Sequence, residues 1–353
     1  MHITSVILYN FRNHKDIHTS FSPNINCFIG ENGTGKSNLF EALYFLNTGK
    51  SFRTHRLIDL VHHEQSLFTL SASLQRQEIS ETLQVRYGKQ LGRELLIDQT
   101  RFTSFLSLLG HVPLVFSAPE DLTIITGSPA ERRRWMDISL SQKDPQYLYH
   151  LGRYQRALQH RNIVLKTKML SGLYPLEHLL TQSATYLITQ RKALLTRLTT
   201  PCTQNMQMLS MQRESLAFNY IDSFPGDLTD PFSSIRSKEL EIGTTLIGPH
   251  RDDVRFVLHG KDLATYGSAG QKRSFLLSLR LAEWMILRED LNYTPIFGID
   301  DFGAHLDPSR TKALESLIES MGQVFLTMPT DTLSLPHHRV EFITTYSSFS
   351  PAR

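Results

Sequence analysis

A glycine-rich loop near the start of the chain limits the possible fold more than any other feature. It reads Gly30-Glu31-Asn32-Gly33-Thr34-Gly35-Lys36-Ser37 and matches the phosphate-binding pattern G-x-x-x-x-G-K-[ST]. Glycines let backbone N–H groups converge on phosphate oxygens, Lys36 adds positive charge, and Ser37 offers a hydroxyl to Mg²⁺. Residues 25–29 are strand-like and 37–46 have helical spacing, as this pattern requires. We therefore expect all eight loop residues to bind ATP with Mg²⁺ in an α/β fold.

The second half of such a site comes late in the chain. Apolar residues 295–299 lead into Asp300 and Asp301, the Walker B arrangement. Asp300 is expected to hold Mg²⁺ together with Ser37, and Asp301 to orient or deprotonate the attacking water. Lys36, Asp300 and Asp301 are therefore the candidate catalytic residues. The 264 positions from Lys36 to Asp300 predict a large insertion between the two motifs.

Helical periodicity identifies that insertion. From residue 119 to about 220 glycine is scarce, and 147–165 and 176–198 read as helices. We predict an ATPase head made of residues 1–118 and 241–353, a mixed sheet with helices, interrupted by a mostly helical arm at 119–240. Further strands are expected at 3–9, 67–75, 82–87, 112–116, 244–247, 254–258 and 324–327, and further helices at 271–289 and 309–320. The first third is expected to alternate strand and helix.

Charge is unevenly distributed along the chain. The net charge is only +3, yet residues 132–198 hold twelve Lys/Arg and three Asp/Glu, which leaves −6 for the remainder. Within 147–165, Arg153, Arg156 and His160 are expected opposite the apolar stripe. A solvated helix face explains such a pattern, and so does a polyanionic partner. Because no helix-turn-helix or zinc-finger pattern is present, we expect sequence-tolerant, salt-sensitive contacts to DNA phosphates.

Other classes of protein are disfavoured by composition. No apolar run reaches the ~18 residues of a membrane span, and the N-terminus has no signal-peptide pattern. Cys27 and Cys202 are too few for a disulfide framework or a metal site. We expect a cytoplasmic protein without a membrane partner.

A third glycine loop precedes the expected helix at 271–289. It reads Tyr266-Gly267-Ser268-Ala269-Gly270-Gln271-Lys272-Arg273. The loop can point backbone amides at a ligand, or it can be an ordinary turn at the start of a helix. The residues alone leave both interpretations open.

Together these features resemble the ABC-type ATPase heads of the SMC and RecF proteins, and most closely the RecF family. The matching stretches, in the family's order, are 30–38, Phe116-Ser117-Ala118-Pro119-Glu120-Asp121-Leu122, Gly127-Ser128-Pro129, Arg132-Arg133-Arg134, Gly248-Pro249-His250-Arg251-Asp252-Asp253 and Gly267-Ser268-Ala269-Gly270-Gln271.

The resemblance implies a homodimer that forms when ATP is bound. Ser268, Gly270 and Gln271 of one subunit would complete the site at Lys36 of the other, and Arg12 and Asn13 would approach the nucleotide. It further implies slow, DNA-stimulated ATP hydrolysis and binding to single-stranded, gapped or duplex DNA. The implied partners are RecO and RecR, and the implied role is support of RecA loading at gaps, of replication forks and of the SOS response.

Two stretches depart from the family's pattern. Ala304 and His305 stand where Ser-Glu is usual, although Asp307 is kept, and Met328-Pro329 stands where threonines are usual. The first departure concerns signalling between subunits. Because of the second, the switch contact of the family cannot be assigned to Met328 or Pro329.

Three alternatives remain at this stage. An ATPase subunit of a transporter has closer motif spacing than 264 residues, and a non-enzymatic scaffold does not need Lys36, Asp300 and Asp301. A full SMC-like tether needs a coiled coil far longer than the expected arm. DNA stimulation of ATP hydrolysis separates the first two alternatives from the RecF-like reading.

Overall fold

Two compact units make up the structure. The computed structural model describes residues 1–342 except 103, 169, 211–214, 224–231 and 304–307. Unit 1 contains Met1–Glu120 and Leu287–Arg353, and unit 2 contains Asp121–Ile286. The second unit runs past the predicted arm end at residue 240. The predicted bounds of the head and the arm stay a prediction.

An antiparallel sheet forms one layer of unit 1. Its order is β2-β1-β4-β5-β6-β7, with β1 at His2–Phe11, β2 at His14–Ser20, β4 at Leu67–Arg76, β5 at Ile79–Gly88, β6 at Gly92–Ile97 and β7 at Thr100–Phe102. Tight turns at Gln77 and at Asp98–Gln99, all with left-handed backbone, join β4 to β5 and β6 to β7. The predicted strand–helix alternation is therefore wrong for residues 67–102, which form hairpins.

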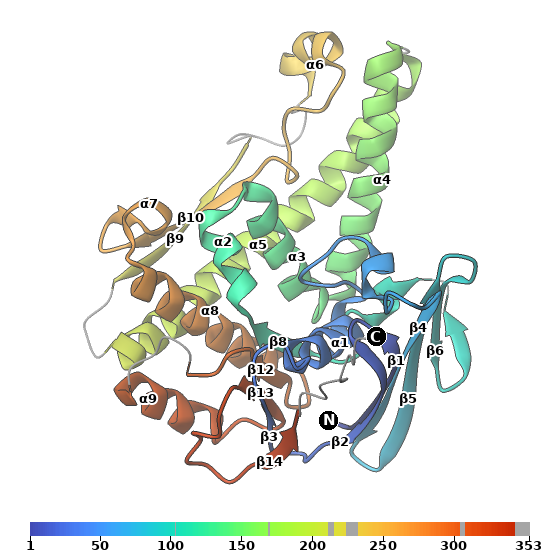
Figure 1. Cartoon of the computed structure of the whole chain (residues 1–353). Coiled ribbons are helices and arrows are strands. Elements are labelled where there is room, and N and C mark those ends of the chain that lie inside the picture. Colours follow the sequence, from blue (N-terminus) through green and yellow to red (C-terminus); the bar gives the residue numbers. More distant parts are fainter. Residues whose placement is uncertain (103, 169, 211–214, 224–231, 304–307, 343–353) are drawn as a thin grey trace, which may run out of the picture. The chain divides into compact units, whose positions relative to one another are not determined.

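A parallel sheet forms the other layer of unit 1 (Figure 1). Its order is β14-β3-β13-β12-β8, with β14 at His338–Glu341, β3 at Ile25–Ile29, β13 at Val324–Met328, β12 at Ile296–Ile299 and β8 at Leu114–Ser117. Strands β3, β12 and β13 are buried along their whole length, as their apolar runs predict. Because the strands are parallel, the segments that follow β3, β13, β12 and β8 emerge at one edge.

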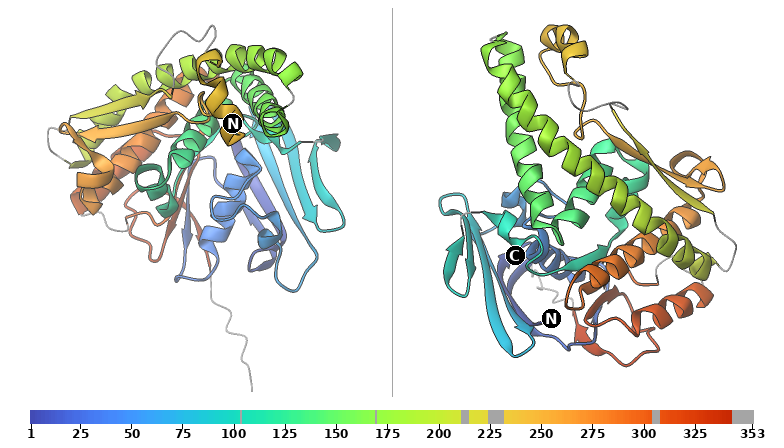
Figure 2. Two further views of the ribbon diagram at one scale, coloured as in Figure 1. Left: turned by 90° about the horizontal axis from the view of Figure 1, so that it is seen from above. Right: turned by 180° about the vertical axis from the view of Figure 1, so that it is seen from behind.

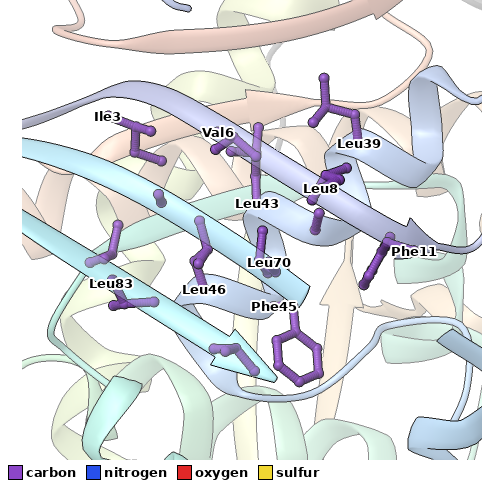
Figure 3. Close-up of a cluster of buried hydrophobic side chains, with 14 of the residues drawn as sticks. Ile3, Val6, Leu8, Phe11, Leu39, Leu43, Phe45, Leu46, Leu70 and Leu83 are labelled. Atoms are coloured by element: carbon purple, nitrogen blue, oxygen red, sulfur yellow. The ribbon is translucent and has the colours of Figure 1, made fainter. Parts of the chain in front are cut away.

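Helix α1, Lys36–Thr48, packs against both layers. Leu39, Leu43, Phe45 and Leu46 meet the apolar side chains of β1, β4 and β5 (Figure 3). The ring of Phe40 packs against that of Phe116 of β8, with centroids 4.0 Å apart and the ring planes tilted by 49°. Burial on nearly all sides fixes the start of α1, and with it the phosphate-binding loop.

Long helices dominate unit 2. Helices α4, Pro145–Thr167, and α5, Leu173–Ser210, form an antiparallel pair (Figure 2). The unit also contains α2 at Leu122–Thr126, α3 at Pro129–Ser141, α6 at Arg236–Ile242 and α7 at Leu263–Tyr266, and a sheet of order β11-β10-β9 at Lys261–Asp262, Asp253–Leu258 and Leu216–Ile221. Helix α8, Ala269–Asp290, runs across the boundary between the units. In unit 1, helix α9 is at Pro308–Ile318, and short 3₁₀ turns lie at Leu57–Leu60 and Phe105–Leu108. A further turn at Pro119–Asp121 spans the end of unit 1, and two more lie in unit 2 at Leu170–Gly172 and Ser233–Ile235.

The strand predicted at 244–247 is wrong. Thr245 N–H donates to Asn162 Oδ1 at 2.8 Å, and Leu246 N–H donates to Glu239 Oε1 at 2.8 Å. Side chains therefore take the donors that a neighbouring strand would otherwise satisfy.

Candidate nucleotide-binding site

The phosphate-binding loop has a backbone that needs its glycines. Gly33 and Gly35 have φ of 86° and 103°, in the left-handed region. A Cβ on Gly35 would collide with the His14 ring, whereas a Cβ on Gly33 would meet nothing within 4 Å. The loop is thus closed by the β1–β2 turn on one side and open at Gly33, which leaves the backbone accessible to an anion.

Lys36 lies across this loop. Its Nζ donates to the carbonyl oxygens of Glu31, at 2.7 Å, and of Gly30. Burial lowers the pKa of Lys36, and the charges of Asp301 and Asp300 oppose that shift. A phosphate oxygen can replace either carbonyl as the acceptor, so the loop, the lysine and the start of α1 fit the triphosphate of a nucleotide.

The structure brings the predicted Mg²⁺ ligands together. Ser37 Oγ donates to Asp300 Oδ1 at 3.1 Å. Thr327 Oγ1 donates to the same Oδ1 at 2.6 Å and accepts from the N–H of Asp301 at 2.8 Å. Burial raises the pKa of Asp300, while the bonds from Thr327 and Ser37 favour its charged form. A hydroxyl beside a buried carboxylate is an oxygen donor set that fits Mg²⁺.

Thr327 is a site residue that sequence reasoning missed. It lies on β13, which separates β3 from β12 in the sheet, so it stands between the two motif-bearing strands. Only the strand order reveals that position. Asp301, the residue after Asp300, is exposed and has a left-handed φ of 58°. Its carboxylate is therefore accessible to solvent.

Arg53 is the second residue that was missed. Its guanidinium donates to Glu120 Oε1 at 3.1 Å and to Asn38 Oδ1 at 3.0 Å, and lies 3.8 Å from Asp300 Oδ2. Glu120 follows β8, whereas Arg53 comes from the segment after α1. A cation thus lies beside the carboxylate that is predicted to hold Mg²⁺, and no local pattern around Arg53 signals it.

The turn between β1 and β2 lies beside the loop. Asn38 Nδ2 donates to Asn13 Oδ1 at 2.7 Å, and a His14 ring nitrogen lies 3.0 Å from the carbonyl oxygen of Gly35. The Arg12 guanidinium is instead paired with Glu41 at 2.6 Å. Contact of Arg12 and Asn13 with the nucleotide stays a prediction.

The third glycine loop forms a capping box. Gln271 N–H donates to Ser268 Oγ at 3.1 Å, and Ser268 N–H donates to Gln271 Oε1 at 2.9 Å. Ser268 and Gly270 are exposed. The turn therefore starts α8 and also presents Ser268 at the surface, so both sequence interpretations survive. Contact of Ser268, Gly270 and Gln271 with a partner's nucleotide stays a prediction.

The basic segment divides into internal and external charges. Three of its arginines are buried in ion pairs: Arg132 with Asp253 at 2.6 Å, Arg161 with Glu239 at 2.5 Å and Arg191 with Asp137 at 2.8 Å. These three of the twelve cations therefore neutralise acids within the unit and are not available to a polyanionic partner. The exposed members on α4 and just after it are Arg156, Lys166 and Lys168, with His160 beside them. The predicted polar face of α4 is confirmed at Arg156 and His160, whereas Arg153 is half-buried and donates to Gln182 Oε1 of α5 at 3.1 Å.

Ala304, His305 and Asp307 lie outside the described residues. Within the described ranges, no helix has the length and apolar character that a membrane span requires.

Comparisons with known proteins agree with this geometry. A model of the family described as RecF/RecN/SMC N terminal domain matches residues 2–338. A Protochlamydia amoebophila protein named DNA replication and repair protein RecF is 36% identical over 348 residues, covering 96% of each chain. A relative of the same name from Lacticaseibacillus casei is 36% identical over 366 residues, covering 99% of this chain and 97% of its own.

Solved structures give the same result. The structure described as the recombination mediator protein RecF with ATP in the RecFOR pathway matches with a TM-score of 0.88 and 27% identity, covering 94% of this chain and 95% of its own. The Smc head domain of Pyrococcus furiosus matches with a TM-score of 0.55 and 17% identity, covering 93% of this chain and 90% of its own, which supports the fold alone. The predicted fold class, an ABC-type ATPase head with a long-helix insertion, is confirmed.

Proposed function

Since the chain belongs to the RecF family of DNA replication and repair proteins, we propose that it is an ATP-dependent DNA-binding protein of recombinational repair and replication-fork maintenance. The observation that carries the ATP part is the convergence of Lys36, Ser37 and Asp300 at the carboxyl edge of one parallel sheet. The repair part depends on the relatives named above.

Each residue of the site has a separate task. The amides that start α1 and the Lys36 ammonium hold the phosphates. Ser37 and Asp300 supply oxygen ligands to Mg²⁺, which when bound withdraws electron density from the terminal phosphate. Thr327 keeps the Asp300 carboxylate turned toward Ser37 through its 2.6 Å hydrogen bond. Asp301 accepts a proton from the attacking water or orients that water.

Arg53 is proposed as a further contact to the terminal phosphate. Its guanidinium lies between Asn38, Glu120 and Asp300, at the carboxyl ends of β8 and β12. A planar guanidinium matches phosphate oxygens well. An Arg53→Lys variant is expected to hydrolyse ATP more slowly while it keeps its fold.

Dimerisation converts ATP binding into a change of assembly. Ser268 of one subunit is proposed to reach the terminal phosphate that Lys36 of the other subunit holds. ATP then favours the closed dimer and ADP does not, so slow hydrolysis acts as a switch through this difference in affinity.

DNA is the proposed partner of the exposed cations on unit 2. Arg156, Lys166 and Lys168 can contact phosphates without reading bases, on single-stranded, gapped or duplex DNA. RecR and RecO are proposed as protein partners because solved relatives are described within the RecFOR pathway. Support of RecA loading and of the SOS response are the proposed outcomes.

One sizing experiment tests the whole scheme. The protein is sized by light scattering without nucleotide, with ADP and with a non-hydrolysable ATP analogue, each with and without DNA. We expect dimers only in the two samples that contain the ATP analogue, and we expect DNA to bind to those dimers. A monomer under all six conditions contradicts the proposal.

A further inference from the structure

Glu41 is a buried carboxylate one helical turn beyond Ser37 on α1, and its side chain has no exposed surface. Arg12 Nε donates to Glu41 Oε2 at 2.8 Å, and Arg12 Nη2 donates to Oε1 at 2.6 Å. The Ser51 hydroxyl also donates to Oε1. A charge removed from water is tolerated when it is paired and hydrogen-bonded in this way, so these three groups form one stable unit.

Ser51 extends this unit to Arg53. Ser51 Oγ accepts from the N–H of Arg53 at 2.8 Å and from the N–H of Thr54 at 3.0 Å. The backbone that carries Arg53 is therefore held through one hydroxyl by Glu41. Arg53 then reaches Asn38 and Asp300 at the phosphate end of the site.

Arg12 extends the same unit to the β1–β2 turn. Its Nη1 donates to the carbonyl oxygen of Asp59 at 2.9 Å, so every guanidinium nitrogen bonds within the chain. Arg12 has a left-handed φ of 56°. Its ion pair holds the turn in the position where Asn13 meets Asn38 and His14 meets Gly35.

We infer that Glu41 is a positioning residue that fixes both flanks of the phosphate-binding loop, the Arg12–His14 turn and the Ser51–Thr54 segment, to helix α1. It acts through Arg12 and Ser51 and touches no reacting atom. The inference depends on the proposed function, because the flanks matter only if the loop binds a nucleotide. It also assigns to Arg12 the task of holding the turn.

A double-mutant cycle tests the inference. Glu41→Gln, Ser51→Ala and the double variant are compared with wild type, and Ser71→Ala, a β4 serine that accepts a bond from Gln84 at 3.0 Å, is the control. Two properties are measured: the Kd for Mg·ATP by calorimetry, and amide hydrogen exchange at 52–55 without nucleotide. Glu41→Gln and Ser51→Ala are each expected to raise the Kd about tenfold and to speed exchange about tenfold. The control should change neither.

Non-additivity is the decisive result. If Glu41 holds Ser51, adding Ser51→Ala to Glu41→Gln should change the Kd less than twofold (about 0.4 kcal/mol). Equal effects of Ser51→Ala in both backgrounds overturn the inference, as does a Glu41→Gln protein that binds and exchanges as wild type does. If Glu41→Gln does not fold, the Ser51→Ala variant decides by itself. A Ser51→Ala protein with unchanged hydrogen exchange and unchanged Kd also overturns the inference. A wild type that binds no Mg·ATP refutes the proposed function instead, while the exchange data still test the positioning role.

Discussion

Ser37 Oγ lies 3.1 Å from Asp300 Oδ1, although 263 positions separate the two residues in the chain. Ser37 is held at the start of a helix buried between two sheets, and Asp300 follows a strand that is buried along its length. The short distance therefore depends on the packing of unit 1, which contains both residues. Substitutions at this pair should change nucleotide chemistry with little effect on the fold.

Asp300→Asn is the first such substitution. The amide has almost the same shape but no negative charge for Mg²⁺. We expect ATP hydrolysis to fall about a hundredfold or more, as when one charge-stabilising group is lost, while Lys36 and the loop amides still bind ATP. Single-turnover hydrolysis and calorimetry measure the two properties. Asp16→Asn, on an exposed strand residue, is the control. Hydrolysis at the wild-type rate in Asp300→Asn rules out its role.

Lys36→Arg probes the loop itself. The ammonium fits between two loop carbonyls and is buried. A planar guanidinium fork cannot occupy the same space. We expect ATP affinity to fall about tenfold to a hundredfold, the range for a lost charge-assisted hydrogen bond. Calorimetry measures the Kd, and the exposed Lys89→Arg should bind as wild type does.

Sequence reasoning succeeded where the information is local. The phosphate-binding loop and the strand before Asp300 can each be recognised from a few consecutive residues, and in the structure both lie at one edge of the parallel sheet. Sequence reasoning missed Thr327 because its place at the site depends on the strand order, and it missed Arg53 because the surrounding segment contains no motif. The basic segment misled for another reason: a charge count does not reveal that Arg161 and Arg191 are buried with acidic partners.

Ser268→Asp separates dimer formation from helix capping. Aspartate caps a helix about as well as serine does, so α8 should keep its start. Its carboxylate should repel the phosphate held by the partner subunit. We expect a protein that binds ATP as a monomer but does not dimerise, measured by light scattering with a non-hydrolysable analogue. Ser268→Thr should dimerise normally. ATP-dependent dimers of Ser268→Asp argue against a composite site.

Charge reversal at the end of α4 tests the DNA proposal. The double variant Lys166→Glu and Lys168→Glu replaces two exposed cations. Each lost phosphate contact lowers the salt dependence of binding by about one unit of slope. We expect DNA affinity in the presence of ATP to fall at least about tenfold and the slope to fall by about two. Fluorescence anisotropy from 50 to about 200 mM salt measures both. Lys261→Glu on β11 is the control, and unchanged affinity in the double variant excludes this surface.

His250 gives unit 2 a pH-dependent stability. Its Nδ1 lies 2.7 Å from the Tyr154 hydroxyl, and its Nε2 donates to the carbonyl oxygen of Thr245 at 3.1 Å; in a neutral ring with this tautomer, Nδ1 accepts the Tyr154 hydroxyl proton. Burial lowers the pKa of His250 from 6.5 to about 4, opposed by the bond to Thr245 and reinforced by the charges of Arg251, Arg133 and Arg161.

The direction of the effect follows from proton binding. Between pH 6.5 and pH 4 the unfolded chain binds a proton at His250 that the folded unit does not. The free energy of unfolding should therefore fall as the pH falls through this window, by about 2 kcal/mol at pH 4.5 from this group alone. His250→Gln cannot titrate, so its loss between pH 7.5 and pH 4.5 should be smaller by about the same amount.

The chain offers a clean probe of this difference. Its two tryptophans, Trp135 and Trp284, are both buried in unit 2, so their fluorescence follows the unfolding of that unit in urea. The other titratable groups, carboxylates and histidines, contribute equally to both proteins and cancel in the comparison. Parallel pH profiles for wild type and His250→Gln would mean that folding does not lower the pKa of His250, and they would refute the assignment of a neutral ring at this site.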